Sequence, residues 1–537
     1  MLKFGEFCYK LVLVENNGGI KLFNYRPMVV CALSLILGIA VGGLFVQNNI
    51  FGAIILLVLI FAIAIYYRFS NLIGFILKHG VCVCFAVLFL VYGFGAVSIK
   101  TITFKPYSNK AVSISASGTI VESGQHLLVS NLKATYYNSN ENKIMHDHPL
   151  SGAYYLYFAD DYAESKNLEV GDDVVFSGTI SFNKSVTKNG EINTALFSSG
   201  VYGSIYLSYN DISKTGTHTK TETFDFLKNG AKNFFKQNLG ELEANVAYAM
   251  VFGEKEGLGE LYQDFKLSGM AHLLAVSGLH VGFFVVILTF ICSILHLKSK
   301  TKFFVVISVL FVYAWVCGFT TSVTRALIMT ACLMLSLLVA KQYDSLSALG
   351  FAAIIILLIR PLDLFSLGFK LSFCAVLGII LMAKPLTRLF AKFLGEKFGG
   401  AVAVTTSATI GTLPILITIY SRVSSLSILA NLIAVPIASA AYMSLMVFSI
   451  IVAVLPFLRF ILAVPQVLIK ALIYIAKITA GLDRAFVEFI PDKLLVLAVL
   501  VFAFMASDYV FINKKAKRAF GLALAVLLMF SAGIYAF

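Results

Sequence analysis

The sequence predicts a polytopic α-helical membrane protein of about 13 spans with an extracytoplasmic OB-like β-barrel domain. Hydrophobic residues make up 59% of the 537-residue chain and charged residues only 13%, too little polar surface for a water-soluble globule. The apolar residues gather in runs of ~20, the length that crosses a bilayer. Between residues 100 and 225 the runs instead shorten and alternate with polar residues, as β-strands do.

Residues 1–99 predict a cytoplasmic leader followed by three membrane helices. Their apolar runs are residues 27–46, 50–67 and 80–99. Arg26 precedes the first run, and Arg68 and Lys78 lie between the second and the third. Because basic residues favour the cytoplasmic side, we expect a multi-pass protein of the cytoplasmic (plasma) membrane with its N-terminus in the cytoplasm. The segment after the third run is then outside.

Residues 100–225 predict a soluble β domain outside the cytoplasm. The strand candidates are residues 112–120, 126–134, 152–159, 173–182 and 200–207. Five short strands in about a hundred residues favour a small barrel of the OB type. Tyr154 and Tyr155 are candidates for stacking on the bases of a nucleic acid, although tyrosine is also common in ordinary strands. His146-Asp147-His148 has the composition of a metal site, but without further ligands a solvated loop explains it better.

Residues 226–252 predict an amphipathic helix at the outer membrane surface, because their apolar residues recur close to a helical period. Lys228, Lys232 and Lys236 form a separate stripe on this helix. Lipid headgroups are the favoured partners of the three lysines. A polyanion at a channel mouth is the alternative partner.

Residues 253–537 predict a multi-helix membrane domain. Its apolar runs are residues 268–296, 303–320, 322–340, 345–359, 366–383, 401–420, 426–455, 457–479, 494–511 and 519–537. The run 345–359 is short for a span, and the run 426–455 is long and contains Pro436, so either can be re-entrant.

The most unusual stretch is residues 269–282, where polar residues stand in apolar sequence. An ionisable group in hydrocarbon costs several kcal/mol, so His272 and His280 must face protein, water or each other. In a helix Ser277 and His280 would share a face, and Gly278 would let a neighbouring backbone approach closely. The combination favours a packed or broken helix.

Polar residues recur further along the membrane domain, at Arg325, Lys370, Ser372 and Asn431. Each has an ordinary explanation: the cations can extend to an interface, and the asparagine can hydrogen-bond between helices. Together with the two histidines they favour the lining of a polar passage.

Five segments of the chain carry a resemblance to a known family. They are Val-Phe-Gly-Glu-Lys at 251–255, Phe-Lys-Leu-Ser-Gly at 265–269, the His-to-Val segment at 272–281, Gly-Phe-Lys-Leu-Ser-Phe at 368–373 and Asn-Leu-Ile-Ala-Val-Pro at 431–436. These segments closely resemble the competence domain of the ComEC family of DNA-uptake channels. The order of parts, with early membrane helices, an OB-like domain and then a helical block, also resembles that family.

The resemblance implies a channel that imports single-stranded DNA across the cytoplasmic membrane during natural transformation. It implies contacts with DNA in transit and with membrane lipid, together with a DNA receptor, a separate nuclease and cytoplasmic DNA-handling proteins. A homo-oligomer is an open alternative, and no cofactor is implied. The expected path residues are His272, Ser277, Gly278, His280, Arg325, Lys370, Ser372 and Asn431.

Two departures from the family pattern qualify this expectation. Lys370 stands where the family usually has glutamine. Many members also continue into a metallo-β-lactamase-like domain thought to degrade one DNA strand. No His-x-His-x-Asp-His sequence occurs before Phe537, so we expect a chain that is not an enzyme and a nuclease that is a separate polypeptide or absent.

Two other functions are compatible with the sequence. A small-solute transporter would also need polar groups inside the membrane. An intramembrane serine hydrolase, with Ser277 as nucleophile and His280 or His272 as base, is the less favoured alternative. Rhomboid-like proteases present Gly-x-Ser-Gly, whereas residues 275–278 are Ala-Val-Ser-Gly.

Overall fold

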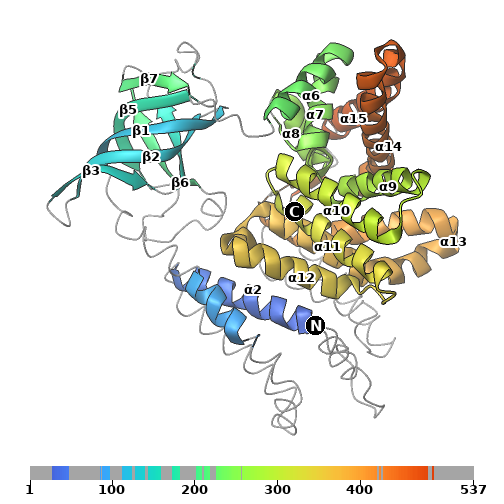
Figure 1. Cartoon of the computed structure of the whole chain (residues 1–537). Helices are drawn as coiled ribbons and strands as arrows, with labels where there is room; N and C mark the ends of the chain where they lie inside the picture. The colour runs from blue at the N-terminus through green and yellow to red at the C-terminus, as the bar shows by residue number, and fades with distance from the viewer. Residues whose placement is uncertain are drawn as a thin grey trace, which may run out of the picture. The chain divides into compact units, whose positions relative to one another are not determined.

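The computed structural model describes about two thirds of the chain in detail. The described residues are 27–46, 85, 87–96, 112–123, 127–138, 143–150, 152–158, 168, 172–181, 201–208, 211–217, 225–255, 257–419, 422–424, 427–481 and 486–488. They fall into two compact units (Figure 1). One unit holds the β domain and most of helix α2 (Pro27–Val46), and the other holds most of the later helices.

The β domain is a closed barrel with two further strands at its edges. The strands are β1 (Val112–Ser123), β2 (Leu127–Asn138), β3 (Lys143–Leu150), β4 (Ala153–Phe158), β5 (Asp172–Ser181), β6 (Val201–Leu207) and β7 (Ile212–Thr217). The order β1-β2-β4-β6-β5 closes because β5 also pairs with β1. The barrel pairs are antiparallel except β4 with β6, which is parallel. The five strand candidates thus form an OB-like barrel, as predicted.

Alternation along the strands fills the barrel. Buried side chains alternate with half-buried or exposed ones from Ala153 to Tyr157 on β4 and from Asp172 to Ser177 on β5, and the buried ones include Tyr154, Leu156, Val174 and Phe176. Residues of this pattern point to one face of each strand, which here is the interior.

The sequence pattern missed the two edge strands, β3 on β2 and β7 on β5. Neither shows a regular alternation of apolar and polar residues, since β3 reads Lys-Ile-Met-His-Asp-His-Pro-Leu and β7 reads Ile-Ser-Lys-Thr-Gly-Thr. The segment His146-Asp147-His148 therefore lies on strand β3 and not in the loop expected from its composition. Its side chains are outside the described residues.

Helix α2 packs against the helical segment Val87–Ala96 through glycine. A Cβ added to Gly38 would collide with the backbone of Leu90. A Cβ added to Gly93 would lie 2.8 Å from the Leu35 carbonyl oxygen. Small residues at both contact points allow the two backbones to approach closely, which is typical of helix pairs in membranes.

Helices dominate the second unit. They are α6 (Asp225–Asn238), α7 (Glu241–Phe252), α8 (Gly259–Leu267), η4 (Ala271–Leu274), α9 (Gly278–Ile294), α10 (Ser299–Val316), α11 (Thr321–Leu338), α12 (Ser345–Ile359), η5 (Pro361–Phe365), α13 (Leu367–Ile419), α14 (Ser427–Val454), η6 (Pro456–Leu462) and α15 (Ala463–Ala480). The first residues of α6 and the stretch from the middle of α12 to the start of α13 are grouped with the β domain. Two short strands, β8 (Arg422–Ser424) and β9 (Phe486–Glu488), form an antiparallel pair.

Six helical segments among the described residues are long and apolar enough to cross a membrane. They are Ser299–Val316, Thr321–Leu338, Leu367–Glu396, Phe398–Leu416, Leu429–Val454 and Pro456–Ala480. Four shorter apolar helices accompany them: Pro27–Gly43, Val87–Ala96, Gly278–Ile294 and Ser345–Ile359. The expected count of thirteen is not reached, and the predicted runs 50–67, 494–511 and 519–537 lie outside the described residues.

The two predicted runs 366–383 and 401–420 form one continuous element, α13, which reverses at Gly395. Gly395 has φ of +74°, a left-handed conformation that interrupts the helix. The two arms then contact each other, since a Cβ added to Gly378 would lie 3.0 Å from the Gly411 Cα. The element is therefore a hairpin of two helices.

One other expectation was wrong. The predicted helix 226–252 is broken at Gly240 into α6 and α7, and α7 is buried from Val246 to Val251, so only α6 has the exposure of a surface helix. The run 268–296 is divided between η4 and α9, which agrees with the packed or broken helix expected from the polar residues at 269–282. The run 345–359 coincides with α12.

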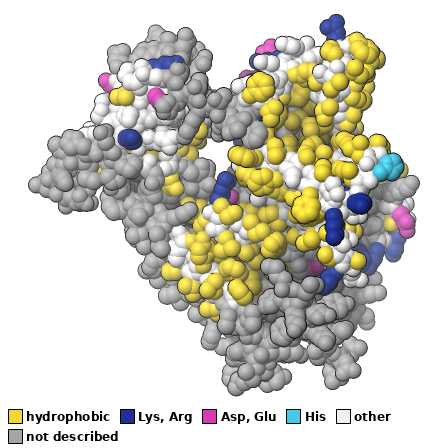
Figure 2. All heavy atoms as spheres, in the orientation of Figure 1, with side chains coloured by type: hydrophobic (Ala, Val, Ile, Leu, Met, Phe, Trp, Pro, Cys, Tyr) yellow, Lys and Arg dark blue, Asp and Glu magenta, His cyan; other side chains and the backbone are white. Residues whose placement is uncertain are grey.

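The described residues of the helical unit form three apolar cores. The largest joins α7, α8, α14 and α15, and the second joins α9, α10 and α11 (Figure 1). The third is small and lies within α13, around Leu381 and Met382. Large apolar side chains also cover much of the outer surface in Figure 2, and Phe304, Leu337 and Val454 are 66%, 73% and 73% exposed. Such a surface is costly in water and favourable in lipid, which agrees with a membrane-spanning protein.

Candidate functional site

The site is built around the break between α8 and α9. Helix α8 ends because Gly269 adopts φ of +74°. Its N–H donates to the Lys266 carbonyl oxygen at 3.1 Å, and the Met270 N–H donates to the Phe265 carbonyl oxygen at 2.8 Å. This paired arrangement is a Schellman motif, which favours glycine at the left-handed position. The chain then makes the short helix η4 before α9 begins.

Ser277 and His280 start helix α9 together. The His280 N–H donates to Ser277 Oγ and the Ser277 N–H donates to His280 Nδ1, each over 3.4 Å. Each side chain thus satisfies a backbone donor at the helix start, as in a capping box. Because Nδ1 accepts a hydrogen bond, the proton of a neutral imidazole lies on Nε2. The Ser277 hydroxyl is bonded to the backbone and not to the imidazole, which is unlike a nucleophile and its base.

A buried polar chain runs from His280 to the end of α7. The imidazole stacks on Tyr442 of α14, with ring centroids 4.5 Å apart and planes 14° apart. The Tyr442 and Tyr313 hydroxyl oxygens are 3.2 Å apart, and the Tyr313 hydroxyl donates to the Val251 carbonyl oxygen at 2.8 Å. The thiol of Cys317 points to the same carbonyl oxygen at 3.9 Å. These contacts join α7, α9, α10 and α14.

Arg325 of α11 lies against the start of α9. Its side chain is only 6% exposed, and a Cβ added to Gly278 would lie 2.6 Å from Arg325 Nη2. Within the described part of the chain, Nε has no hydrogen-bond partner. Tyr343, in the turn between α11 and α12, is an ionisable side chain that interacts electrostatically with Arg325. Burial raises the pKa of Tyr343 to about 12, so this phenol stays neutral and supplies no counter-charge.

The other predicted path residues are spread around this site. Asn431 of α14 reaches the break, where its Nδ2 donates to the Gly269 carbonyl oxygen at 3.4 Å. His272 is exposed on η4. On α13 Lys370 is half-buried and Ser372 is buried. The structure therefore brings Ser277, Gly278, His280 and Arg325 together, places Asn431 at the break, and records no direct contact of Lys370 or Ser372 with this group.

Unsatisfied polar atoms mark the same residues. Five buried side-chain atoms lack a hydrogen-bond partner among the described residues: His280 Nε2, Arg325 Nε, Ser372 Oγ, Asn431 Oδ1 and Ser449 Oγ. Four of the five belong to residues singled out from the sequence. Ser449 was missed because a lone serine in an apolar run carries no signal of its own.

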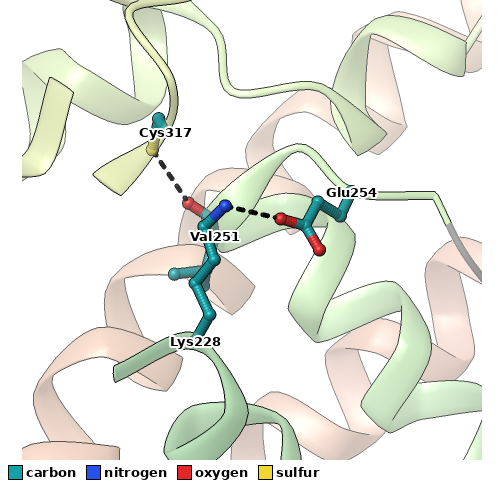
Figure 3. Close-up of polar contacts among 4 residues, drawn as sticks. All are labelled: Lys228, Val251, Glu254 and Cys317. Carbon is teal, nitrogen blue, oxygen red and sulfur yellow. Dashed lines mark hydrogen bonds and ion pairs between the residues drawn. The ribbon is translucent and has the colours of Figure 1, made fainter. Parts of the chain in front are cut away.

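Two lysines of the stripe on α6 are engaged by protein. Figure 3 shows Lys228 reaching the carboxylate of Glu254, with Nζ and Oε1 2.8 Å apart, beside the Val251 carbonyl group that the Cys317 thiol faces. Lys232 Nζ lies 5.5 Å from the centre of the Tyr248 ring, whereas Lys236 is exposed. The prediction that all three lysines face outward is therefore wrong for Lys228, because Glu254 neutralises its charge within the fold.

The two tyrosines proposed to contact bases have opposite environments. Tyr154 is fully buried in the barrel, so it cannot stack on a base. Tyr155 is half-buried on the other face, with its ring centroid 6.4 Å from that of Tyr157. Tyr157 in turn stacks on Tyr206 at 5.3 Å, and Tyr206 is 44% exposed. The parallel β4–β6 pairing creates this aromatic row, which the sequence alone could not show.

The comparisons with known proteins agree with the motif. The family model described as competence protein matches residues 250–531. ComE operon protein 3 of Bacillus subtilis (strain 168) is 30% identical over 177 residues, which are 33% of this chain and 22% of that protein. An uncharacterized protein of Aquifex aeolicus (strain VF5) is 34% identical over 194 residues, 36% of this chain and 44% of that protein.

Recombination protein 2 of Haemophilus influenzae (strain ATCC 51907 / DSM 11121 / KW20 / Rd) is 24% identical over 239 residues, 40% of this chain and 29% of that protein. The matches thus span less than half the length of these curated relatives. No solved structure matches significantly. Since the family match covers more than half of the 537 residues, the chain belongs to the competence protein family, the ComEC-type family that its central motif resembles.

Proposed function

We propose that the helical unit forms a path for single-stranded DNA across the cytoplasmic membrane during natural transformation. Membership of the competence protein family supports this function. One relative is named recombination protein 2, and a protein that imports DNA would supply the substrate for recombination.

The observation that carries the proposal is the set of unsatisfied polar atoms at His280, Arg325, Ser372 and Asn431. Leaving one buried donor or acceptor unpaired costs about 1–3 kcal/mol in a protein interior. Four such atoms belong to predicted path residues. Hydrogen bonds from these atoms to water or to a polar substrate would remove this cost. Intramembrane polar groups of this kind mark ion and substrate pathways.

The broken backbone at residues 268–277 supports the same function. Non-helical backbone is tolerated at membrane depth where protein buries it or where it borders a water-filled cavity. Broken helices of this kind form the binding sites of many transporters, because their ends expose unpaired backbone groups. Here the break separates α8 from α9 and is contacted by Asn431.

The charges fit a polyanion in transit. Arg325 is buried and forms no ion pair with a carboxylate among the described residues, and Lys370 is half-buried on α13. A DNA strand carries one negative charge per phosphate, so its route needs a positive bias that is weak enough to allow release. One buried and one half-buried cation supply such a bias without a continuous basic surface.

A DNA path of this kind would involve membrane lipid and partner proteins. Lipid would cover the exposed apolar helices, and an N-terminus on the cytoplasmic side would place the β domain outside. A DNA receptor would deliver the substrate, a separate nuclease would produce the single strand, and cytoplasmic proteins would receive it. The row of Tyr155, Tyr157 and Tyr206 would offer stacking surfaces to bases outside the membrane.

The test is DNase-protected uptake of labelled double-stranded DNA in a competent host, compared between the intact gene, a deletion and a deletion complemented with this chain. We expect protected label to disappear on deletion and to return on complementation. Uptake that survives the deletion would refute the DNA path and favour a small-solute transporter, which vesicle assays with purified protein can then examine.

A further inference from the structure

The surroundings of Arg325 would favour a bound anion. Arg325 is only 6% exposed, and its Nε has no hydrogen-bond partner among the described residues. The neutral phenol of Tyr343 is the ionisable neighbour that influences it. A guanidinium group stays protonated in proteins, and no carboxylate in the described part of the chain forms an ion pair with this one.

The position of Arg325 increases that need. Its guanidinium group lies at the N-terminus of α9, a 17-residue helix. A helix N-terminus carries about half a positive charge, which repels a cation and attracts an anion. Two positive groups held together in a buried place are unfavourable on their own, and an anion between them would be attracted by both.

Backbone donors are also present at this helix start. The capping box occupies the N–H groups of Ser277 and His280. The N–H groups of Gly278 and Leu279 belong to the first turn, where no intrahelical carbonyl is available to accept from them. They are therefore suited to an oxyanion, as in other phosphate-binding helix starts.

Gly278 makes the arrangement possible. Any larger residue would place its Cβ 2.6 Å from Arg325 Nη2, closer than atoms can approach without a shift. The absence of a side chain lets the guanidinium group reach the backbone of the helix start. By contrast, a Cβ on Gly282, one turn later in the same helix, would meet nothing within 4 Å.

We propose that Arg325 and the first turn of α9 at Gly278 bind one phosphodiester group of the DNA strand. This assignment rests on the proposed function for the identity of the ligand. The required chemistry is a tetrahedral oxyanion that accepts from a guanidinium group and backbone N–H groups. Inorganic phosphate and lipid headgroups share that chemistry, so the experiment must separate the three sources. A single contact of this kind is weak enough to be made and broken as each phosphate passes.

The first experiment measures oligonucleotide binding by fluorescence anisotropy with the full chain in nanodiscs of zwitterionic lipid. The probe is labelled oligo-dT, and its competitors are unlabelled oligo-dT, an oligo-dT with an uncharged methylphosphonate backbone, inorganic phosphate, and nanodiscs containing phosphatidylglycerol. We expect oligo-dT to compete strongly and the methylphosphonate form to compete at least tenfold less well. Equal competition by the uncharged strand would overturn the phosphodiester assignment, as would displacement by phosphatidylglycerol alone.

The second experiment compares variants in the same assay. Arg325→Gln and Gly278→Ala should each weaken oligo-dT binding about tenfold or more, the effect of losing a hydrogen bond to a charged group. The slope of log affinity against log salt should fall by about 0.7 for Arg325→Gln, as for one phosphate contact on a single strand. Gly282→Ala and Arg459→Gln, at an open helix position and an exposed arginine, should stay within about twofold of the parent protein.

Folding and function are separated by two further readouts. Thermal unfolding identifies a variant that fails to fold. Where both Arg325 variants fold, Arg325→Lys, which keeps the charge, should retain more affinity than Arg325→Gln. If Arg325→Gln does not fold, the comparison of Gly278→Ala with Gly282→Ala tests the site. Unchanged affinity and salt slope in a folded Arg325→Gln protein would overturn this site. DNase-protected uptake that is lost in the deletion strain but normal with Arg325→Gln would also overturn the site while leaving the DNA path intact. Uptake unaffected by the deletion would instead overturn the proposed function.

Discussion

The imidazole of His280 lies flat against the ring of Tyr442, with the two ring centroids 4.5 Å apart. Both side chains are completely buried, and they come from helices far apart in the sequence. The stack places one polar side chain of the central motif at the junction of α9 and α14. The Nε2 atom of His280 has no hydrogen-bond partner in the described structure.

This stack leads to a prediction for His280→Ala. Removing the imidazole should lower DNase-protected uptake by about tenfold, equivalent to about 1.4 kcal/mol, because an unsatisfied buried donor on the path is lost. Protein abundance in the membrane should change little, and a western blot of membrane fractions checks it. Thr289→Ala, at a residue of α9 whose hydroxyl donates to the Val286 carbonyl oxygen of the same helix, is the control and should import DNA normally. Normal import by His280→Ala would remove the histidine from the path.

The hydroxyl of Tyr442 provides a second prediction. Tyr442→Phe keeps the ring against His280 and removes the contact with the Tyr313 hydroxyl, which still donates to Val251. The loss should destabilise the protein by about 1 kcal/mol, the usual contribution of one hydrogen bond, and uptake should remain. Thermal unfolding in detergent measures the first effect. A variant as stable as the parent would show that the hydroxyl pair contributes nothing.

The break before α9 depends on the backbone of Gly269. An alanine there must adopt φ of +74°, so Gly269→Ala should lower the free energy of unfolding by ~1–2 kcal/mol. Gly282→Ala, in an ordinary helical position with open space around it, should be neutral or slightly stabilising. The comparison of the two unfolding temperatures tests the role of the left-handed residue, and equal temperatures would contradict it.

The ion pair between Lys228 and Glu254 ties α6 to the segment after α7. A double-mutant cycle with Lys228→Met and Glu254→Gln should give a coupling energy of about 0.5–1 kcal/mol, since both groups are partly exposed. High salt should reduce this coupling. Lys236→Met, at the exposed end of the same helix, is the matched control and should show no coupling with Glu254→Gln.

The barrel gives a prediction that separates core from surface. Tyr154→Ala should destabilise the β domain by about 3–5 kcal/mol, because a fully buried ring leaves a cavity. Tyr206→Ala should cost much less, since that ring is 44% exposed and packs on one side against Tyr157. Limited proteolysis of the full chain compares the two variants. Equal sensitivity would mean that the interior of the barrel has been assigned to the wrong face.

The sequence alone determined the class of the protein and many of its elements. Apolar length predicts α12 at residues 345–359, because a bilayer requires continuous apolar sequence whatever the neighbours are. Alternation likewise predicts the five barrel strands, and the cost of burying polar groups singles out His280, Arg325, Ser372 and Asn431. These are local properties of the chain.

Only the tertiary structure decided which residues meet and which faces are buried. Alternation says that Tyr154 and Tyr155 face opposite sides, but the packing of the barrel decides that Tyr154 is inside. Hydropathy could not divide residues 268–296, since the break depends on the turn at Gly269 and on Asn431 from α14. The approach of Arg325 to Gly278 likewise joins two helices by contacts between residues distant in the chain, and no local pattern encodes such a contact.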